Sequence, residues 1–192
     1  GFNDIKKLPP GHFIKIDLVK KSFVIKKYWE PKFDKKLALS EDLWSKKIIE
    51  TLTQSVSLRM VSDVPLGVFL SGGVDSGAIV ATMSKLSKRK VKTFTVTFKD
   101  KTWDESKFAL NTVKRYKTEH VELPVDPQNI EILPAICQNF EEPFADSGVI
   151  LSYLVAKLAK KYVTVVLNGD GGDEIFAGYP SRHFRLKRDV DY

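Results

Sequence analysis

The chain has 192 residues, of which 43% are hydrophobic and 29% are charged, enough for one buried core and an appendage. No apolar run approaches the roughly 20 residues of a membrane helix, the first residues lack the apolar segment of a signal peptide, and Cys137 is the only cysteine. The formal net charge is +7, but the lysines are scattered or lie in short clusters, which is typical of a solvated surface. We therefore expect a cytoplasmic protein with neither a membrane nor a nucleic-acid partner.

The first 63 residues predict a β-hairpin followed by a long helix. Apolar residues alternate in the strand manner over residues 12–29, interrupted by a Lys-Lys-Ser turn. Residues 30–39 contain Pro31 and charges of both signs, which favours a linker. Ser40 is suited to cap a helix whose apolar residues recur with helical spacing up to about Asp63.

From Val64 onward, strand-like and helical segments alternate. Such alternation requires right-handed crossovers and gives a parallel sheet with helices on both faces. The predicted fold class is therefore α/β, a doubly wound parallel sheet preceded by a short β-hairpin appendage. Strands are predicted over residues 64–70, 91–98, 119–123 and 163–167, and helices over residues 74–86, 104–117, 127–140, 147–161 and 175–179.

A glycine-rich loop follows the first of these strands. Residues 71–76, which we call the first loop, read Ser-Gly-Gly-Val-Asp-Ser and open a helix. Glycines at 72 and 73 allow a sharp turn that aims several N–H groups at one anion, and the helix adds its positive end. Asp75 can hold Mg²⁺ beside the phosphates, and no Walker-type Gly-Lys-Ser/Thr follows.

A second glycine-rich loop follows the fourth strand. Residues 168–174, the second loop, interleave three glycines with three acids and again precede a helix. Clustered carboxylates beside a phosphate site make sense if Mg²⁺ lies between them. If the fourth strand pairs with the first, and the second and third lie on the other flank, both loops meet at the carboxyl edge of the sheet. Asp75 and Asp173 then hold one Mg²⁺-pyrophosphate from two sides.

The two loops together carry a resemblance. The first loop resembles the S-G-G-x-D-S loop of ATP pyrophosphatases, and with Gly-Asp-Gly-Gly-Asp-Glu-Ile-Phe-Ala-Gly-Tyr the chain resembles the synthetase half of glutamine-hydrolysing asparagine synthetases of the class II amidotransferase type. The resemblance implies an adenine nucleotide alpha-hydrolase-like sheet. It also implies that residues 1–39 are the end of a glutaminase-like domain and a linker, and that residues 40–192 are a C-terminally truncated ATP pyrophosphatase synthetase domain.

The resemblance also implies a reaction and its ligands. ATP and Mg²⁺ are the expected cofactors, and aspartate is adenylated to β-aspartyl-AMP with release of pyrophosphate. Ammonia, derived from glutamine by the glutaminase domain of the same full-length protein, then displaces AMP. By this resemblance Leu70 and Val96 border the adenosine, Asn168 and Gly169 lie against the nucleotide, Ser71, Gly72, Gly73 and Ser76 cradle pyrophosphate, and Asp75 and Asp173 bind Mg²⁺.

Two further residues receive catalytic roles from the resemblance. Asp170 stands where many relatives carry glutamate, and manages the ammonia proton with a shorter side chain; Tyr179 matches a tyrosine near the acyl-adenylate. A lysine that assists adenylation in the family lies downstream of the matched region, so we expect the isolated chain to be weak or inactive. The resemblance is compatible with a homodimer.

Three alternatives stay open. The chain could belong to another amidotransferase-like ligase that forms a lactam or a peptide, or it could bind nucleotide without turnover. An RNA-modifying pyrophosphatase is disfavoured because those enzymes often carry paired cysteines, and this chain has no Cys-x-x-Cys. His120 is expected to be a polar residue at a strand start, and Cys137 a packed thiol.

Overall fold

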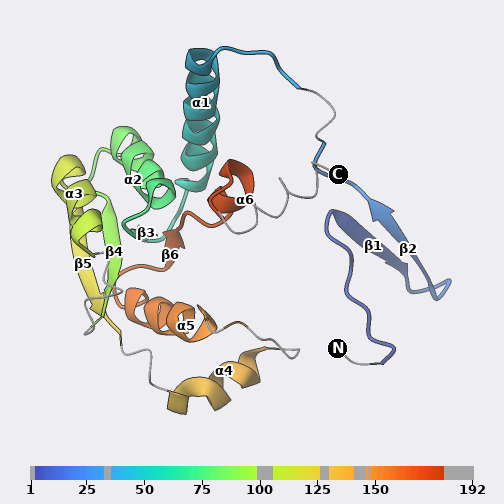
Figure 1. The fold of residues 1–192 in the computed structure, drawn as a ribbon. Coiled ribbons are helices and arrows are strands. Elements are labelled where there is room, and N and C mark those ends of the chain that lie inside the picture. Colours follow the sequence, from blue (N-terminus) through green and yellow to red (C-terminus); the bar gives the residue numbers. More distant parts are fainter. Residues whose placement is uncertain are drawn as a thin grey trace, which may run out of the picture.

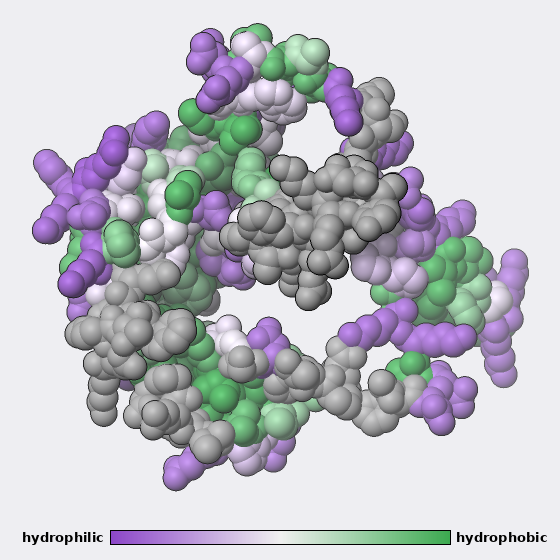
Figure 2. Space-filling view, viewed as in Figure 1, coloured by the Kyte–Doolittle hydropathy of each residue, from purple (hydrophilic) through white to green (hydrophobic). Residues whose placement is uncertain are grey.

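The computed structural model describes residues 3–32, 36–98, 106–125, 130–140, 146 and 148–179, and it contains a separate hairpin and a four-stranded parallel sheet (Figure 1). The hairpin pairs β1 (His12–Asp17) with β2 (Ser22–Lys27) in antiparallel register. Most of its side chains are exposed, and Figure 2 shows apolar residues on its surface. The predicted hairpin is therefore confirmed.

The strand order of the parallel sheet is the one that brings the two loops to the same edge. Its strands are β3 (Leu66–Phe69), β4 (Lys92–Thr97), β5 (Glu119–Pro124) and β6 (Val165–Leu167). They are arranged β5-β4-β3-β6, and every neighbouring pair is parallel. The predicted order is confirmed, with the fourth strand beside the first.

Helices cover both faces of this sheet (Figure 1). One core layer contains Val68, Val80 and Ala109, and joins the sheet to α1 (Glu41–Arg59), α2 (Val74–Leu86) and α3 (Ser106–Tyr116). The other layer contains Phe94 and Val155, and packs α5 (Gly148–Ala159) against the opposite face. The predicted doubly wound α/β class is confirmed. Within the described ranges, no helix is both long enough and apolar enough to span a bilayer.

Several predicted boundaries are corrected by the structure. Helix α1 is capped by the Ser40 hydroxyl, which accepts from the N–H of Leu43, and it ends at Arg59 rather than near Asp63. Pro134 lies in the first turn of α4 (Leu133–Asn139), where its missing N–H costs nothing, after a 3-10 turn (Ile130–Ile132). The predicted starts at residues 104–105 and 127–129 lie outside the described residues.

The end of the chain differs most from the prediction. Strand β6 is three residues long instead of the predicted 163–167. Val165 is 41% exposed because, among the described strands, β6 lies at the edge of the sheet and pairs only with β3. Helix α6 (Gly172–Phe176) begins three residues before the predicted start at Ile175. It ends where Ala177 adopts a left-handed conformation, with φ of 67°. The second loop therefore already includes the first helical turn.

Candidate functional site

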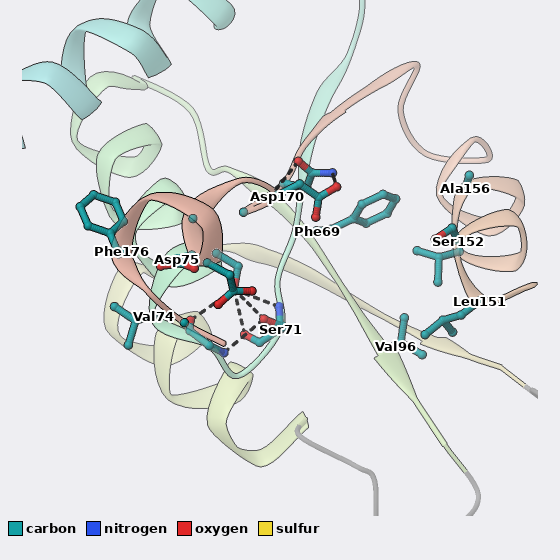
Figure 3. Close-up of a pocket in the computed structure, with 18 residues that line it drawn as sticks. Phe69, Ser71, Val74, Asp75, Val96, Leu151, Ser152, Ala156, Asp170 and Phe176 are labelled. Carbon is teal, nitrogen blue, oxygen red and sulfur yellow. Dashed lines mark hydrogen bonds between the residues drawn. The ribbon is translucent and has the colours of Figure 1, made fainter. Parts of the chain in front are cut away.

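The two loops face a common cavity of about 960 Å³ at the carboxyl edge of the sheet (Figure 3). The first loop contributes Ser71, Asp75 and Ser76, and the second contributes Asn168 and Asp170, among others. Residues at the ends of β3 and β4 form the floor, and α5 forms the wall opposite the loops. The structure thus brings together residues that lie almost 100 positions apart in the sequence.

The first loop is closed by the hydroxyl of Ser76. This side chain is only 5% exposed, and its Oγ accepts from the N–H of Ser71 at 3.2 Å and lies 2.9 Å from the Oγ of Ser71. The N–H of Gly73 donates to the Ser71 Oγ at 3.2 Å. Gly73 is also the N-cap of α2, and no side chain caps that helix. The loop is therefore held by its own serines, while the helix start faces the cavity without a side-chain cap.

The second loop is shaped by backbone conformation and by one amide. Gly171 has a φ of +89°, a conformation that favours glycine, and serves as the N-cap of α6. The Nδ2 of Asn168 donates to the Oδ2 of Asp170 at 2.7 Å, and the N–H of Asp170 donates back to the Oδ1 of Asn168 at 3.4 Å. Asn168 thereby orients the Asp170 carboxylate, and both residues line the cavity.

The two loops also touch each other. A Cβ placed on Gly169 would lie 3.0 Å from the backbone nitrogen of Ser76 and 3.1 Å from the Cβ of Asp75. A Cβ on Gly172 would overlap the Asp75 carboxylate. The resemblance placed Gly169 against the nucleotide; the close approach that the structure shows is to the first loop.

The carboxylates predicted to bind Mg²⁺ lie at one cavity. Asp75 and Asp173 are both half-buried and both line it. Within the described part of the chain, no group of three or more His, Cys, Asp or Glu side chains could hold a metal ion. Two carboxylates suit Mg²⁺ in a nucleotide site, because that ion usually keeps waters and phosphate oxygens in its shell. The magnesium site stays a prediction.

A smaller apolar recess of about 260 Å³ adjoins the ends of β3 and β4. Leu70 and Val96 line it, together with Phe69 and Leu151. The backbone of Leu70 is fixed on both sides, since its N–H donates to the carbonyl of Phe94 at 2.8 Å and its carbonyl accepts from the Thr95 hydroxyl at 2.7 Å. The recess is thus an apolar pocket beside the first loop, and hydrogen bonds on both sides of Leu70 hold its backbone in place.

Two predicted site residues lie outside these cavity walls. Gly72 and Tyr179 line neither of the two cavities. The Tyr179 hydroxyl donates to the Oε1 of Glu174 at 3.1 Å, within the same chain segment. The structure therefore places Tyr179 beside the second loop, and its role near an acyl-adenylate stays a prediction.

The wall that α5 provides was not among the predicted site features. Leu151, Ser152 and Ala156 face the cavity across from Asp170, with Phe69 between them (Figure 3). Helical spacing predicted an apolar face for this helix but could not tell which of its residues pack against the sheet and which line a cavity. Only the packing of α5 against the sheet distinguishes the two.

The remaining candidates behave as packing or surface residues. His120 lies at the start of β5, at the opposite edge of the sheet, and its Nδ1 lies 3.0 Å from the Thr93 hydroxyl. Burial lowers the pKa of His120, against opposing effects from Glu122 and Thr93. The expectation for His120 is confirmed. Cys137 is exposed on α4, so the prediction of a packed thiol was wrong; Ile136 is the buried residue of that helix.

Comparison with known proteins agrees with this geometry. The family described as asparagine synthase matches residues 47–192. A relative in Bacillus subtilis named asparagine synthetase (glutamine-hydrolysing) 1 is 38% identical over 91% of this chain, and a Penicillium rubens relative named as an amidase is 27% identical over 100% of it. The chain spans 27% and 31% of the lengths of these two relatives.

A solved structure supports the fold. The glutamine-dependent NAD⁺ synthetase of Acinetobacter baumannii, determined with adenosine diphosphate, superposes with a TM-score of 0.50 and 19% identity. The match covers 86% of this chain and 31% of that chain. At this level of identity the likeness concerns the sheet and its helices.

Proposed function

Because the chain belongs to the asparagine synthase family, we propose that it forms the ATP-activating part of an enzyme that makes asparagine. The β-carboxylate of aspartate attacks the α-phosphate of ATP, forming β-aspartyl-AMP and releasing pyrophosphate. Ammonia then attacks the acyl carbon, AMP leaves, and one proton is lost. The observation that carries this proposal is that both glycine-rich loops line one cavity at the carboxyl edge of the sheet.

The first loop would hold the β- and γ-phosphates. Backbone N–H groups around Gly72 and Gly73, the serine hydroxyls of the loop and the positive end of α2 suit a leaving pyrophosphate. Asp75 and Asp173 would hold Mg²⁺ against it, which neutralises the charge that develops as the bond to the α-phosphate breaks. The start of α2, which has no side-chain cap, supports this role. The N–H groups of Ser71 and Gly73 donate to serine hydroxyls of the same loop in the structure, and would exchange these acceptors for phosphate oxygens.

The adenosine would lie beside the phosphate loop. The apolar recess bordered by Leu70 and Val96 suits a planar base, which is largely apolar on its faces. Asn168 and Gly169 would flank the nucleotide from the second loop. This arrangement leaves the α-phosphate between the loops, where the acid must attack.

Asp170 and Tyr179 would act on the second half of the reaction. An ionised Asp170 can take the proton that ammonia loses when it attacks the acyl carbon, and the Asn168 amide holds this carboxylate at the cavity. Tyr179 would lie near the acyl-adenylate.

Ammonia would come from a glutaminase domain of the same full-length protein. The chain spans 27% and 31% of the lengths of two curated relatives, and the exposed hairpin at residues 12–27 would belong to the end of that domain. A cytoplasmic enzyme, as a monomer or a homodimer, is consistent with this scheme. The isolated chain would show little turnover.

The test is the acid that triggers pyrophosphate release. The natural full-length protein would be supplied with Mg-ATP and a panel of amino acids and larger carboxylic acids, and pyrophosphate would be measured in a coupled assay. Release that depends on aspartate, with asparagine formed when ammonia is added, supports the proposal. Release with another acid would instead support a ligase that forms a lactam or a different amide. The amidase name of one relative shows that similar chains are not all named for asparagine synthesis.

A further inference from the structure

The second loop rests on the first at a backbone contact that leaves no space for a side chain. A Cβ on Gly169 would lie 3.0 Å from the nitrogen of Ser76, 3.1 Å from the Cβ of Asp75 and 3.3 Å from the carbonyl carbon of Asp75. These atoms belong to the start of α2 and cannot rotate away. Any residue larger than glycine at position 169 must therefore displace one loop from the other by a few tenths of an ångström.

The second loop makes a second contact with Asp75, at its carboxylate. A Cβ on Gly172 would overlap the Asp75 carboxylate, and the N–H of Gly172 donates to the carbonyl of Gly169 at 3.2 Å. Both glycines thus belong to one turn. Gly169 lies against the backbone of Asp75, and Gly172 lies against its carboxylate. An added Cβ on Gly171, which lies between them, would have no atom within 4 Å. Glycine is favoured at this position by its positive φ and not by lack of space.

We propose that Gly169 and Gly172 are positioning residues for Asp75. The second loop fits onto the first through these two positions, and this contact fixes where the Asp75 carboxylate lies relative to the cavity. The inference rests on the proposed function, which assigns Asp75 to Mg²⁺-pyrophosphate. It adds that the second loop controls this site by contact with a residue of the first loop, in addition to its own carboxylates.

Calorimetric titration of the 192-residue chain tests the proposal with two ligands. Pyrophosphate with Mg²⁺ reports the Asp75 site, and AMP reports the nucleotide site. We expect Gly169→Ala to weaken Mg²⁺-pyrophosphate binding by about tenfold or more, and to weaken AMP binding by a clearly smaller factor. Equal losses for both ligands would show that Gly169 acts by touching the nucleotide, and would overturn the proposal.

Gly77 supplies the matched control. It follows Ser76 directly in α2, and a Cβ there would meet only the Thr112 hydroxyl at 3.8 Å, an ordinary contact. Gly77→Ala should leave the affinities for both ligands within twofold of the wild-type values. A loss of Mg²⁺-pyrophosphate binding in Gly77→Ala as large as in Gly169→Ala would overturn the assignment of the effect to the loop contact.

A double variant separates this inference from the proposed function. If Gly169 acts through Asp75, then in an Asp75→Asn background Gly169→Ala should cost less than a further twofold; a full tenfold loss there overturns the positioning role. Wild-type affinity in Asp75→Asn alone would remove the metal assignment, and the proposal with it.

If thermal melting shows that Gly169→Ala does not fold, Gly172→Ala replaces it, because that methyl meets a carboxylate that can rotate. Unchanged Mg²⁺-pyrophosphate affinity in Gly172→Ala then overturns the proposal.

Discussion

A hydrogen bond between two side-chain hydroxyls occurs at both the carboxyl and the amino edge of the parallel sheet, but in different surroundings. At the carboxyl edge the hydroxyls of Ser71 and Ser76 lie 2.9 Å apart, and at the amino edge those of Thr93 and Thr118 lie 2.9 Å apart. The first pair closes a glycine-rich loop beside a cavity, whereas Thr93 is fully buried between strands and helices. Hydroxyl pairs therefore do not mark a functional site by themselves; the adjoining glycines and acids do.

The largest expected difference between the edges concerns Asp75. Replacing it with asparagine keeps its shape but removes a charge predicted to bind Mg²⁺, so Mg²⁺-pyrophosphate affinity should fall by at least about 100-fold. AMP affinity should change little. Glu119→Gln at the amino edge is the control. The Glu119 carboxylate pairs with Lys92 at 3.8 Å on the surface, so its loss should affect neither ligand. Titration calorimetry measures both, and similar losses for the two ligands in Asp75→Asn would contradict the metal role.

The next effect tests how the first loop is held. Ser76→Ala removes the acceptor for the Ser71 N–H, and we expect it to lower the free energy of unfolding by about 1–3 kcal/mol. Ser84 lies in the same helix, and its buried hydroxyl has no hydrogen-bond partner among the described residues. Ser84→Ala should therefore cost almost nothing. Urea unfolding compares the two variants, and equal losses would mean that the Ser76 hydroxyl does not hold the loop.

At the amino edge the corresponding change should affect stability alone. Thr93→Val keeps the side-chain volume but removes the partner of the Thr118 hydroxyl and of the His120 Nδ1, at a cost of about 1–2 kcal/mol. Because this cluster lies at the start of β4 and β5, Mg²⁺-pyrophosphate affinity should stay within twofold of the wild-type value. A larger loss of ligand affinity would show that the two edges are coupled.

The sequence predicts the sheet and the meeting point of the loops better than it predicts the last strand and helix. The alternation of strands and helices predicted the doubly wound sheet, and the placement of two glycine-rich loops after β3 and β6 predicted where they meet. The short β6 and the early start of α6 could not be predicted. The exposure of an edge strand depends on which strands pair, and three glycines in one loop do not show which of them begins the helix.

The contact of Gly169 with Asp75 was equally hidden. A glycine next to acids reads as a loop that approaches a ligand, and only the positions of the two strands show that it approaches another loop. The cavity wall on α5 was missed for a related reason, since Leu151 and Val155 share one apolar face but also line the cavity. Local patterns therefore predict which residues are special more readily than they predict what those residues touch.

The smallest expected effect is a pH dependence that belongs to the amino edge. Burial lowers the pKa of His120 below its ordinary value of 6.5, and Glu122 and Thr93 partly offset this effect. The Nε2 of His120 is buried without a hydrogen-bond partner among the described residues. The folded state therefore binds this proton less readily than the unfolded state, so stability is full above about pH 6.5 and falls as the pH drops below it. Urea unfolding between pH 5 and 8 should show this slope in the wild type, and His120→Asn should reduce it. His12→Asn, on the separate hairpin, controls for loss of a histidine; an undiminished slope in His120→Asn would assign the pH dependence to other groups.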